Sequence, residues 1–212
     1  MKKFIFALLM VLPLYFCGGC RLAALAATPA PYDRKVPAEY KLKDRQNEKV
    51  LIVVEESPGA GAGLDIRQKL GASLYKILID RAKLKRKNVI LFNESEYFRQ
   101  KGDSKVSPVE MGNDLGAGLV LYTRIMNYHL EPSGPLDYYI GSMTARSFLL
   151  DINDEELVWP ADGNPKLVRM AINLETRGSD ETNEKLLSAT AHGISRNLYD
   201  VRVRHYRTSA EQ

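Results

Sequence analysis

The run Lys49–Glu55, which reads KVLIVVE, restricts the fold of this chain more than any other segment. Five apolar and mostly β-branched residues in a row are typical of a strand that is buried on both faces of a sheet. A loop with Pro and three glycines follows. Ile66, Leu70, Leu74 and Leu78 then recur at helical spacing behind Asp65, a predicted N-cap. The run Asn88–Phe92 predicts a second strand, so the domain is expected to begin with a right-handed parallel β-α-β unit.

The later segments continue this pattern. Ser107 and Pro108 predict a helix start, and Leu119–Tyr128 and Tyr138–Asp151 predict two strands joined by a turn over Glu131–Asp137. Shorter strands are expected at Leu157–Trp159 and Leu167–Leu174. A last helix is expected to begin with Ser179 as its cap and to continue through Val201. The order is β-α-β-α-β-β-β-β-α, which predicts an α/β (α+β) domain with one mixed sheet and helices packed on it.

The N-terminus predicts export and lipidation. Two lysines precede an apolar run of 13 residues, Phe4–Phe16, which fits a signal peptide and is short of the roughly 20 residues that span a bilayer. The segment Cys17-Gly18-Gly19-Cys20 resembles the lipobox of bacterial lipoproteins, although Cys17 stands where that pattern usually has Leu. We expect cleavage before Cys20 and lipid on its thiol. Ordinary secretion with cleavage after Ala26 is the main alternative, and an uncleaved anchor is the other.

These observations divide the chain into four parts. Residues 1–19 are the predicted signal peptide, and residues 20–48, rich in Ala, Pro and charge, are the acylated cysteine and a flexible tether. Residues 49–203 form the single domain, and residues 204–212 a tail. By resemblance to enterobacterial sorting, Arg21 in place of Asp after the lipidated cysteine implies delivery to the periplasmic face of the outer membrane.

Charge and cysteine usage exclude several kinds of function. The formal charge of +4 falls to 4 − 2 = +2 without Lys2 and Lys3, which does not favour nucleic acid as a partner. A group of basic residues lies near the C-terminus: Arg202, Arg204, His205 and Arg207. We interpret this group as a solvated helix end, because cations favour the negative end of a helix dipole. Only Cys17 and Cys20 are present, so the domain has neither a disulfide nor a cysteine nucleophile.

Three patterns that can carry chemistry have simpler interpretations. Gly59–Gly63 has the spacing G-x-G-x-G and lacks a following Gly-Lys-Ser/Thr, which favours a connector over a phosphate-binding loop. Asp151, Asn153 and Glu155 alternate like calcium ligands, but Leu157 and Trp159 break the pattern. The histidines His129, His192 and His205 stand far apart. We therefore predict no catalytic residue, no metal and no cofactor other than the lipid on Cys20.

The segments Leu115–Tyr122 (LGAGLVLY) and Phe148–Trp159 (FLLDINDEELVW) carry a family resemblance. This series of elements resembles a group of periplasmic lipoproteins that includes the curli-secretion lipoprotein and the penicillin-binding-protein activator lipoproteins. The series consists of a helix ending in a glycine turn, an apolar strand, a long hairpin, and an aspartate turn that leads into "LVW". The resemblance implies a fold like the amino-terminal domain of TolB. This sequence departs from the curli-secretion type because it has no strands beyond those that the domain core needs, and a pore requires additional ones. It departs from the synthase activators because its predicted tether is shorter.

The predicted function is that of an accessory lipoprotein rather than an enzyme. We expect a non-enzymatic interaction module in a cell-envelope assembly or secretion complex, with an envelope protein or a second copy as its partner. The alternatives are a regulator of a peptidoglycan synthase and, from another class, an envelope hydrolase. Aromatic residues are enriched in binding hot spots. Tyr128, Tyr138 and Tyr139 at the predicted hairpin are therefore the candidate partner surface, although aromatic residues are also common in strands.

Overall fold

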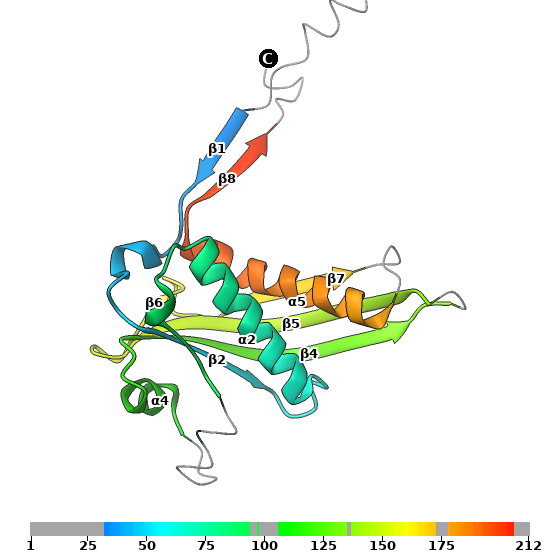
Figure 1. Cartoon of the computed structure of the whole chain (residues 1–212), viewed down its shortest axis with the longest axis horizontal. Coiled ribbons are helices and arrows are strands. Elements are labelled where there is room, and N and C mark those ends of the chain that lie inside the picture. The colour runs from blue at the N-terminus through cyan, green and yellow to red at the C-terminus, as the bar shows by residue number, and fades with distance from the viewer. Residues whose placement is uncertain (1–31, 94–96, 98–105, 135–136, 173–177, 206–212) are drawn as a thin grey trace, which may run out of the picture. The chain divides into compact units, whose positions relative to one another are not determined.

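The computed structural model describes residues 32–93, 97, 106–134, 137–172 and 178–205 (Figure 1). Its main body, residues 37–201, has the predicted α+β class and the predicted order of elements. These elements are β2 (Val50–Glu56), α2 (Gly63–Asp80), β3 (Val89–Leu91), α4 (Pro108–Asp114), β4 (Leu119–Pro132), β5 (Tyr139–Asp151), β6 (Glu156–Trp159), β7 (Lys166–Ile172) and α5 (Ser179–Ser195).

The strands form one mixed six-stranded sheet in the order β3-β2-β4-β5-β6, with β7 also paired to β5. The apolar run of β2 lies inside this sheet, parallel to β3 on one side and to β4 on the other, and Val50 is in register with Val89 and Leu119. The four residues Val50 to Val53 are fully buried. This confirms that the strand is covered on both faces.

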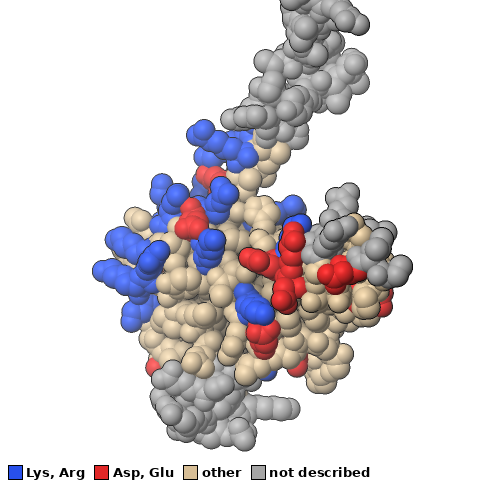
Figure 2. Space-filling view, turned by 45° about the vertical axis from the view of Figure 1, so that its right-hand side comes forward, with Lys and Arg blue, Asp and Glu red and all other residues tan. Residues whose placement is uncertain are grey.

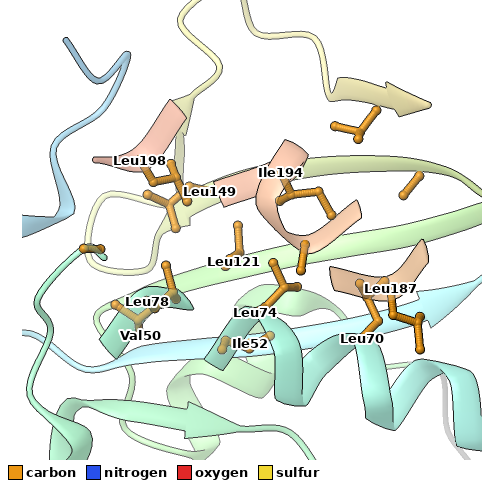
Figure 3. Close-up of a cluster of buried hydrophobic side chains, with 14 of the residues drawn as sticks. Val50, Ile52, Leu70, Leu74, Leu78, Leu121, Leu149, Leu187, Ile194 and Leu198 are labelled. Carbon is orange, nitrogen blue, oxygen red and sulfur yellow. The ribbon is translucent and has the colours of Figure 1, made fainter. Parts of the chain in front are cut away.

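Helices α2 and α5 cover one face of the sheet and enclose the main core (Figures 1 and 3). In α2, Leu70, Leu74 and Leu78 follow at intervals of four and are all fully buried, because that spacing returns to the same side of a helix. The buried residues of α5 include Leu187 and Ile194, which point toward the same cluster.

The other face of the sheet is covered only in part. Ser107 caps α4 as predicted: its Oγ accepts a hydrogen bond from the backbone N of Glu110 at 3.2 Å, and the Glu110 carboxylate accepts one from the Ser107 backbone N at 2.8 Å. This reciprocal capping fixes a helix of only seven residues. Met111 of α4 packs with Val120 and Tyr122 in a second, smaller apolar cluster on this side of the sheet.

Two helix starts differ from the sequence prediction. Helix α2 begins at Gly63 with Ala62 as its N-cap, so Asp65 lies inside the first turn, where its charge still favours the helix dipole. Helix α5 begins at Ser179, and Gly178, with φ +84°, takes the cap position. The last helix also ends earlier than predicted, at Ser195, and is followed by a short 3-10 helix, η3 (Arg196–Leu198).

Residues 37–48 differ most from the expected flexible tether. They contain the 3-10 helix η1 (Leu42–Arg45), and Leu42 is fully buried in the main core. The Glu39 carboxylate accepts hydrogen bonds from the Trp159 indole nitrogen at 2.8 Å and from Lys166 Nζ at 2.9 Å. The Tyr40 backbone N donates to the Asn197 carbonyl at 3.1 Å. This segment is therefore an integral part of the domain.

Two further strands, β1 (Tyr32–Val36) and β8 (Val201–His205), pair with each other in a separate two-stranded ribbon and run in opposite directions (Figure 1). The prediction of a solvated helix end over Arg202, Arg204, His205 and Arg207 is therefore wrong for the first three residues, which lie in β8. Arg207 lies outside the described residues, as do the expected signal peptide and Cys20.

Candidate functional site

Tyr128 has a structural role in the hairpin. It lies on β4 and is half-buried against the main core. Its hydroxyl donates a hydrogen bond to Asn183 Oδ1 of α5 at 3.2 Å. Burial raises the pKa of Tyr128, which is consistent with a phenol that is partly removed from water. Its hydroxyl therefore helps to hold α5 on the sheet, and its ring packs against the main core.

Tyr138 and Tyr139 lie at the start of β5, where the turn of the hairpin closes. The Tyr138 carbonyl accepts a hydrogen bond from the Ser133 backbone N at 2.6 Å, and Tyr139 is in register with Pro132. Both tyrosines are half-buried. Since neighbouring strand residues point to opposite faces, Tyr139 shares the helix-covered side with Tyr128, and Tyr138 points to the other side. The structure therefore does not bring the three predicted tyrosines into one patch.

The glycine-rich loop attaches to the hairpin instead of presenting an anion site. The Ser57 backbone N–H donates a hydrogen bond to the Ile125 carbonyl at 2.8 Å, and the Tyr128 backbone N–H donates one to the Ala60 carbonyl at 2.8 Å. These bonds bracket Met126, where the pairing of β4 with β5 shifts by one residue in a β-bulge. The Gly63 N–H at the start of α2 donates to the Glu56 carboxylate at 2.7 Å. An acidic side chain of the chain itself thus occupies the helix N-terminus, which supports the connector interpretation.

Asp151, considered above as a calcium ligand, takes part in an ion pair. Arg45 Nη2 of η1 lies 2.6 Å from Asp151 Oδ2 and 2.7 Å from Glu48 Oε2. Burial alone raises the pKa of Asp151, but the Arg45 guanidinium and the backbone N–H of Asn153 outweigh it, so the pKa is below the ordinary value. Among the described residues no group of three or more His, Cys, Asp or Glu side chains is arranged to hold a metal ion.

Within the described part of the chain, no helix covers the half of the sheet face that α4 does not reach. We call it the open sheet face and define it by three rows of residues that lie side by side across β4, β5 and β7. The rows are Arg124/Arg146/Leu167, Asn127/Thr144/Arg169 and His129/Ser142/Ala171.

Arginine dominates the open sheet face. Arg124, Arg146 and Arg169 are all exposed, and Leu167 is 42% exposed beside them. Arg124 and Arg146 are directly opposite each other on paired strands, an arrangement that is unfavourable for like charges. Glu55 Oε2 lies 3.5 Å from Arg124 Nη2 and partly offsets this repulsion.

A tyrosine fixes the position of Arg124. The guanidinium donates to the Tyr122 hydroxyl at 2.6 Å and lies over that ring, 5.4 Å from its centroid. The Tyr122 hydroxyl in turn donates to Glu55. Burial, together with this hydrogen bond to the Glu55 carboxylate, raises the pKa of Tyr122 to about 12. Tyr122 therefore stays a neutral donor and holds Arg124 at the border between the second core and the open sheet face.

The histidines and Trp159 lie apart from one another. His129 Nε2 is 2.9 Å from Glu131 on the open sheet face, whereas His192 Nδ1 is 3.2 Å from the Tyr199 hydroxyl at the end of α5. His205 is in the separate ribbon. Trp159 is 1% exposed and belongs to the core. The alternation of polar residues along β4, β5 and β7 indicates from sequence which side of each strand faces water, whereas the neighbours across strands follow only from the register.

The chain matches no protein-family model and no curated protein. Solved structures give distant likenesses. A crystal structure of lipoprotein GNA1162 from Neisseria meningitidis is 18% identical, covering 70% of this chain and 99% of that one with a TM-score of 0.43. A PelC dodecamer from Paraburkholderia phytofirmans is 9% identical over 77% and 96%, with a TM-score of 0.43.

The C-terminal domain of LpoB from Salmonella enterica is 15% identical over 65% of this chain and 85% of that one, with a TM-score of 0.33. The matched structures include a bacterial lipoprotein. Within the part of the chain that the structure describes, no helix has both the length and the apolar character needed to cross a membrane.

Proposed function

We propose that this protein is an exported lipoprotein whose domain is a non-enzymatic interaction module on the periplasmic face of the outer membrane. The observation that carries the interaction role is the open sheet face, with three exposed arginines and Leu167 in adjacent rows on three strands. Arginine is enriched in protein interfaces and among the residues that contribute most to binding. The N-terminal pattern that ends in Cys20 supports the lipid anchor.

The charge of this face indicates the chemistry of the partner. A second copy docked face to face would place Arg146 and Arg169 against the same residues, and like charges across an interface are unfavourable. A partner with exposed carboxylates fits better, since arginine forms bidentate pairs with them. We therefore favour a different envelope protein over self-association.

Site-specific photocrosslinking in cells tests the partner surface. A photoreactive residue at Arg146 or Leu167 should capture the same partner, because these positions are neighbours on paired strands. The matched controls are Lys76 of α2 and Glu184 of α5, both exposed on the opposite, helical side of the domain. Equal capture from the control positions would contradict the proposal. Capture of a peptidoglycan synthase would show contact with that enzyme and favour the alternative role as its regulator.

The anchor needs a separate test. A palmitate analogue supplied to cells should label the wild-type chain, and Cys20→Ala should remove the label. Cleavage after Ala26 would instead leave both chains unlabelled, and the wild-type N-terminus would start at residue 27. That result would refute the lipid anchor without affecting the interaction surface.

A further inference from the structure

The connection between α2 and β3 has the highest density of positive charge in the described part of the chain. Residues 81–87 read RAKLKRK, with five cations in seven positions. We call these five residues, Arg81, Lys83, Lys85, Arg86 and Lys87, the basic loop. All five are exposed, and no ion pair with an acidic side chain is found for any of them within the described residues. The sequence prediction singled out the Arg202–Arg207 stretch and missed this denser one.

The two apolar residues of the loop hold it in place. Ala82 is 2% exposed and Leu84 is 3% exposed, and both belong to the main core. The Leu84 backbone N donates to the Leu78 carbonyl at 3.1 Å. After the loop, Asn88 Nδ2 donates to the Gln46 carbonyl at 2.7 Å. Since the apolar side chains are fixed inward, the five cations are presented outward from a well-packed backbone.

Ordinary helix electrostatics accounts for little of this charge. Arg81 is the C-cap of α2, where a cation favours the negative end of the helix dipole. The other four cations lie beyond α2, with Arg86 and Lys87 in the single-turn 3-10 helix η2 (Arg86–Asn88), and Asp80 is the acid next to them in sequence. From Asp80 to Lys87 the charge is 5 − 1 = +4, whereas the whole chain without Lys2 and Lys3 carries +2. The rest of the predicted mature protein therefore carries 2 − 4 = −2.

The basic loop lies at the same end of the domain as residues 37–48, the first segment of the main body. The bond between Asn88 and Gln46 joins the loop to the segment that carries η1. The acids in the first turns of α2 and α5 lie at the other end of these helices: Asp65, Asp180 and Glu181. In Figure 2 the Lys and Arg side chains gather mainly on one side of the visible face, and the Asp and Glu side chains mainly on the other.

We infer that the basic loop is an electrostatic docking surface for the phosphate headgroups of an anionic phospholipid bilayer. This inference rests on the lipid anchor proposed above for its setting in the cell. Pro37 follows Cys20 by 37 − 20 = 17 residues, so even a fully extended chain keeps the domain within about 60 Å of the acylated residue. Membrane proteins commonly combine an acyl group with a polybasic patch. Here the patch orients the basic end of the domain toward the lipid.

Vesicle binding without the acyl group tests this inference. The predicted mature chain, residues 20–212 with Cys20→Ala, is mixed with vesicles of phosphatidylglycerol and phosphatidylethanolamine, and with vesicles of neutral phosphatidylcholine. One variant adds Lys85→Gln, Arg86→Gln and Lys87→Gln. The matched control adds Lys69→Gln, Lys76→Gln and Lys185→Gln, three exposed cations of α2 and α5, and so removes the same charge elsewhere. All chains have the same N-terminus, so differences in binding report the substituted side chains.

Each cation near an anionic bilayer increases partitioning about fivefold, so the loop variant should bind anionic vesicles about 100-fold more weakly. The control should stay within about twofold of the parent, and added salt should weaken the binding of the parent. The inference is overturned if the control loses as much binding as the loop variant, or if neutral vesicles bind the parent equally well. It is also overturned if inorganic phosphate displaces the parent more strongly than chloride at equal ionic strength, because that result indicates a site for free phosphate.

Discussion

Leu42→Ala should lower the free energy of unfolding by about 3 kcal/mol, within the range of about 2–5 kcal/mol measured when a buried leucine is truncated. Leu42 lies in the segment that has no predicted secondary structure, yet its side chain is fully buried in the main core. The loss combines the transfer free energy of the removed methyl and methylene groups with the cavity that they leave. Several bonds hold the segment in place, including the one from Trp159 to Glu39, so the site is not free to collapse around the smaller side chain.

Thermal and urea unfolding of the full chain measure this effect. For a folded unit the size of residues 37–201, a loss of 1 kcal/mol lowers the melting temperature by about 2–4 °C, so Leu42→Ala should melt about 6–12 °C lower. The matched control is Leu64→Ala in the first turn of α2, where the side chain is 42% exposed and the expected loss is below about 1 kcal/mol. If Leu42→Ala unfolds at the wild-type midpoint, residues 37–48 are a flexible tether and their role in the core is refuted.

Three other substitutions test single interactions. Asp151→Asn should cost about 2 kcal/mol at neutral pH, because the carboxylate accepts a charged hydrogen bond from Arg45. Since the folded pKa of Asp151 is below its usual 3.8, that stability is complete above about pH 4 and is lost as the pH falls further, so urea midpoints of wild type and variant should converge in acid. Gly112→Ala should destabilise by about 1–3 kcal/mol despite the higher helix propensity of alanine, because the new Cβ would lie 2.7 Å from Ile152 Cδ1. Ser107→Ala should remove the N-cap of α4 and cost about 1 kcal/mol in urea unfolding.

A single control serves the two α4 variants. Asn113→Ala lies in the same helix with its side chain exposed, and its unfolding midpoint should stay close to that of the wild type. A Gly112→Ala protein as stable as this control would show that Ile152 moves aside at little cost. For Asp151, a constant difference between wild type and variant down to about pH 2.5 would contradict the assigned pKa direction.

The order of elements could be predicted because its signals are local. The β-branched run of β2, the leucine spacing of α2 and the Ser107-Pro108 cap each act within a few residues. The docking of residues 37–48 depends instead on contacts between residues more than 100 positions apart, such as Arg45 with Asp151. A stretch rich in Pro, Ala and charge therefore looks like a linker until its partners are in place.

The candidate site was less predictable for a different reason. Tyrosine is common in interfaces, which favours Tyr128 from sequence, but in the structure the Tyr128 hydroxyl has a hydrogen-bond partner on the neighbouring helix, Asn183. The open sheet face is formed by residues of three strands that are separate in sequence, and only their register shows that Arg124, Arg146 and Leu167 are neighbours. The basic loop, in contrast, is a contiguous run that charge patterning alone could have found.

The docked segment at residues 37–48 also determines how the protein would respond to tension. If Cys20 is held in a membrane and the open sheet face is bound to a partner, a pulling force meets the pairing of β1 with β8 and then this segment before it reaches the sheet. Release of residues 37–48 would lengthen the connection by at most about 40 Å, the extended length of 12 residues at about 3.3–3.6 Å each. The segment would then act as an extensible link that lets the domain follow its partner while β2, β4 and β5 remain folded.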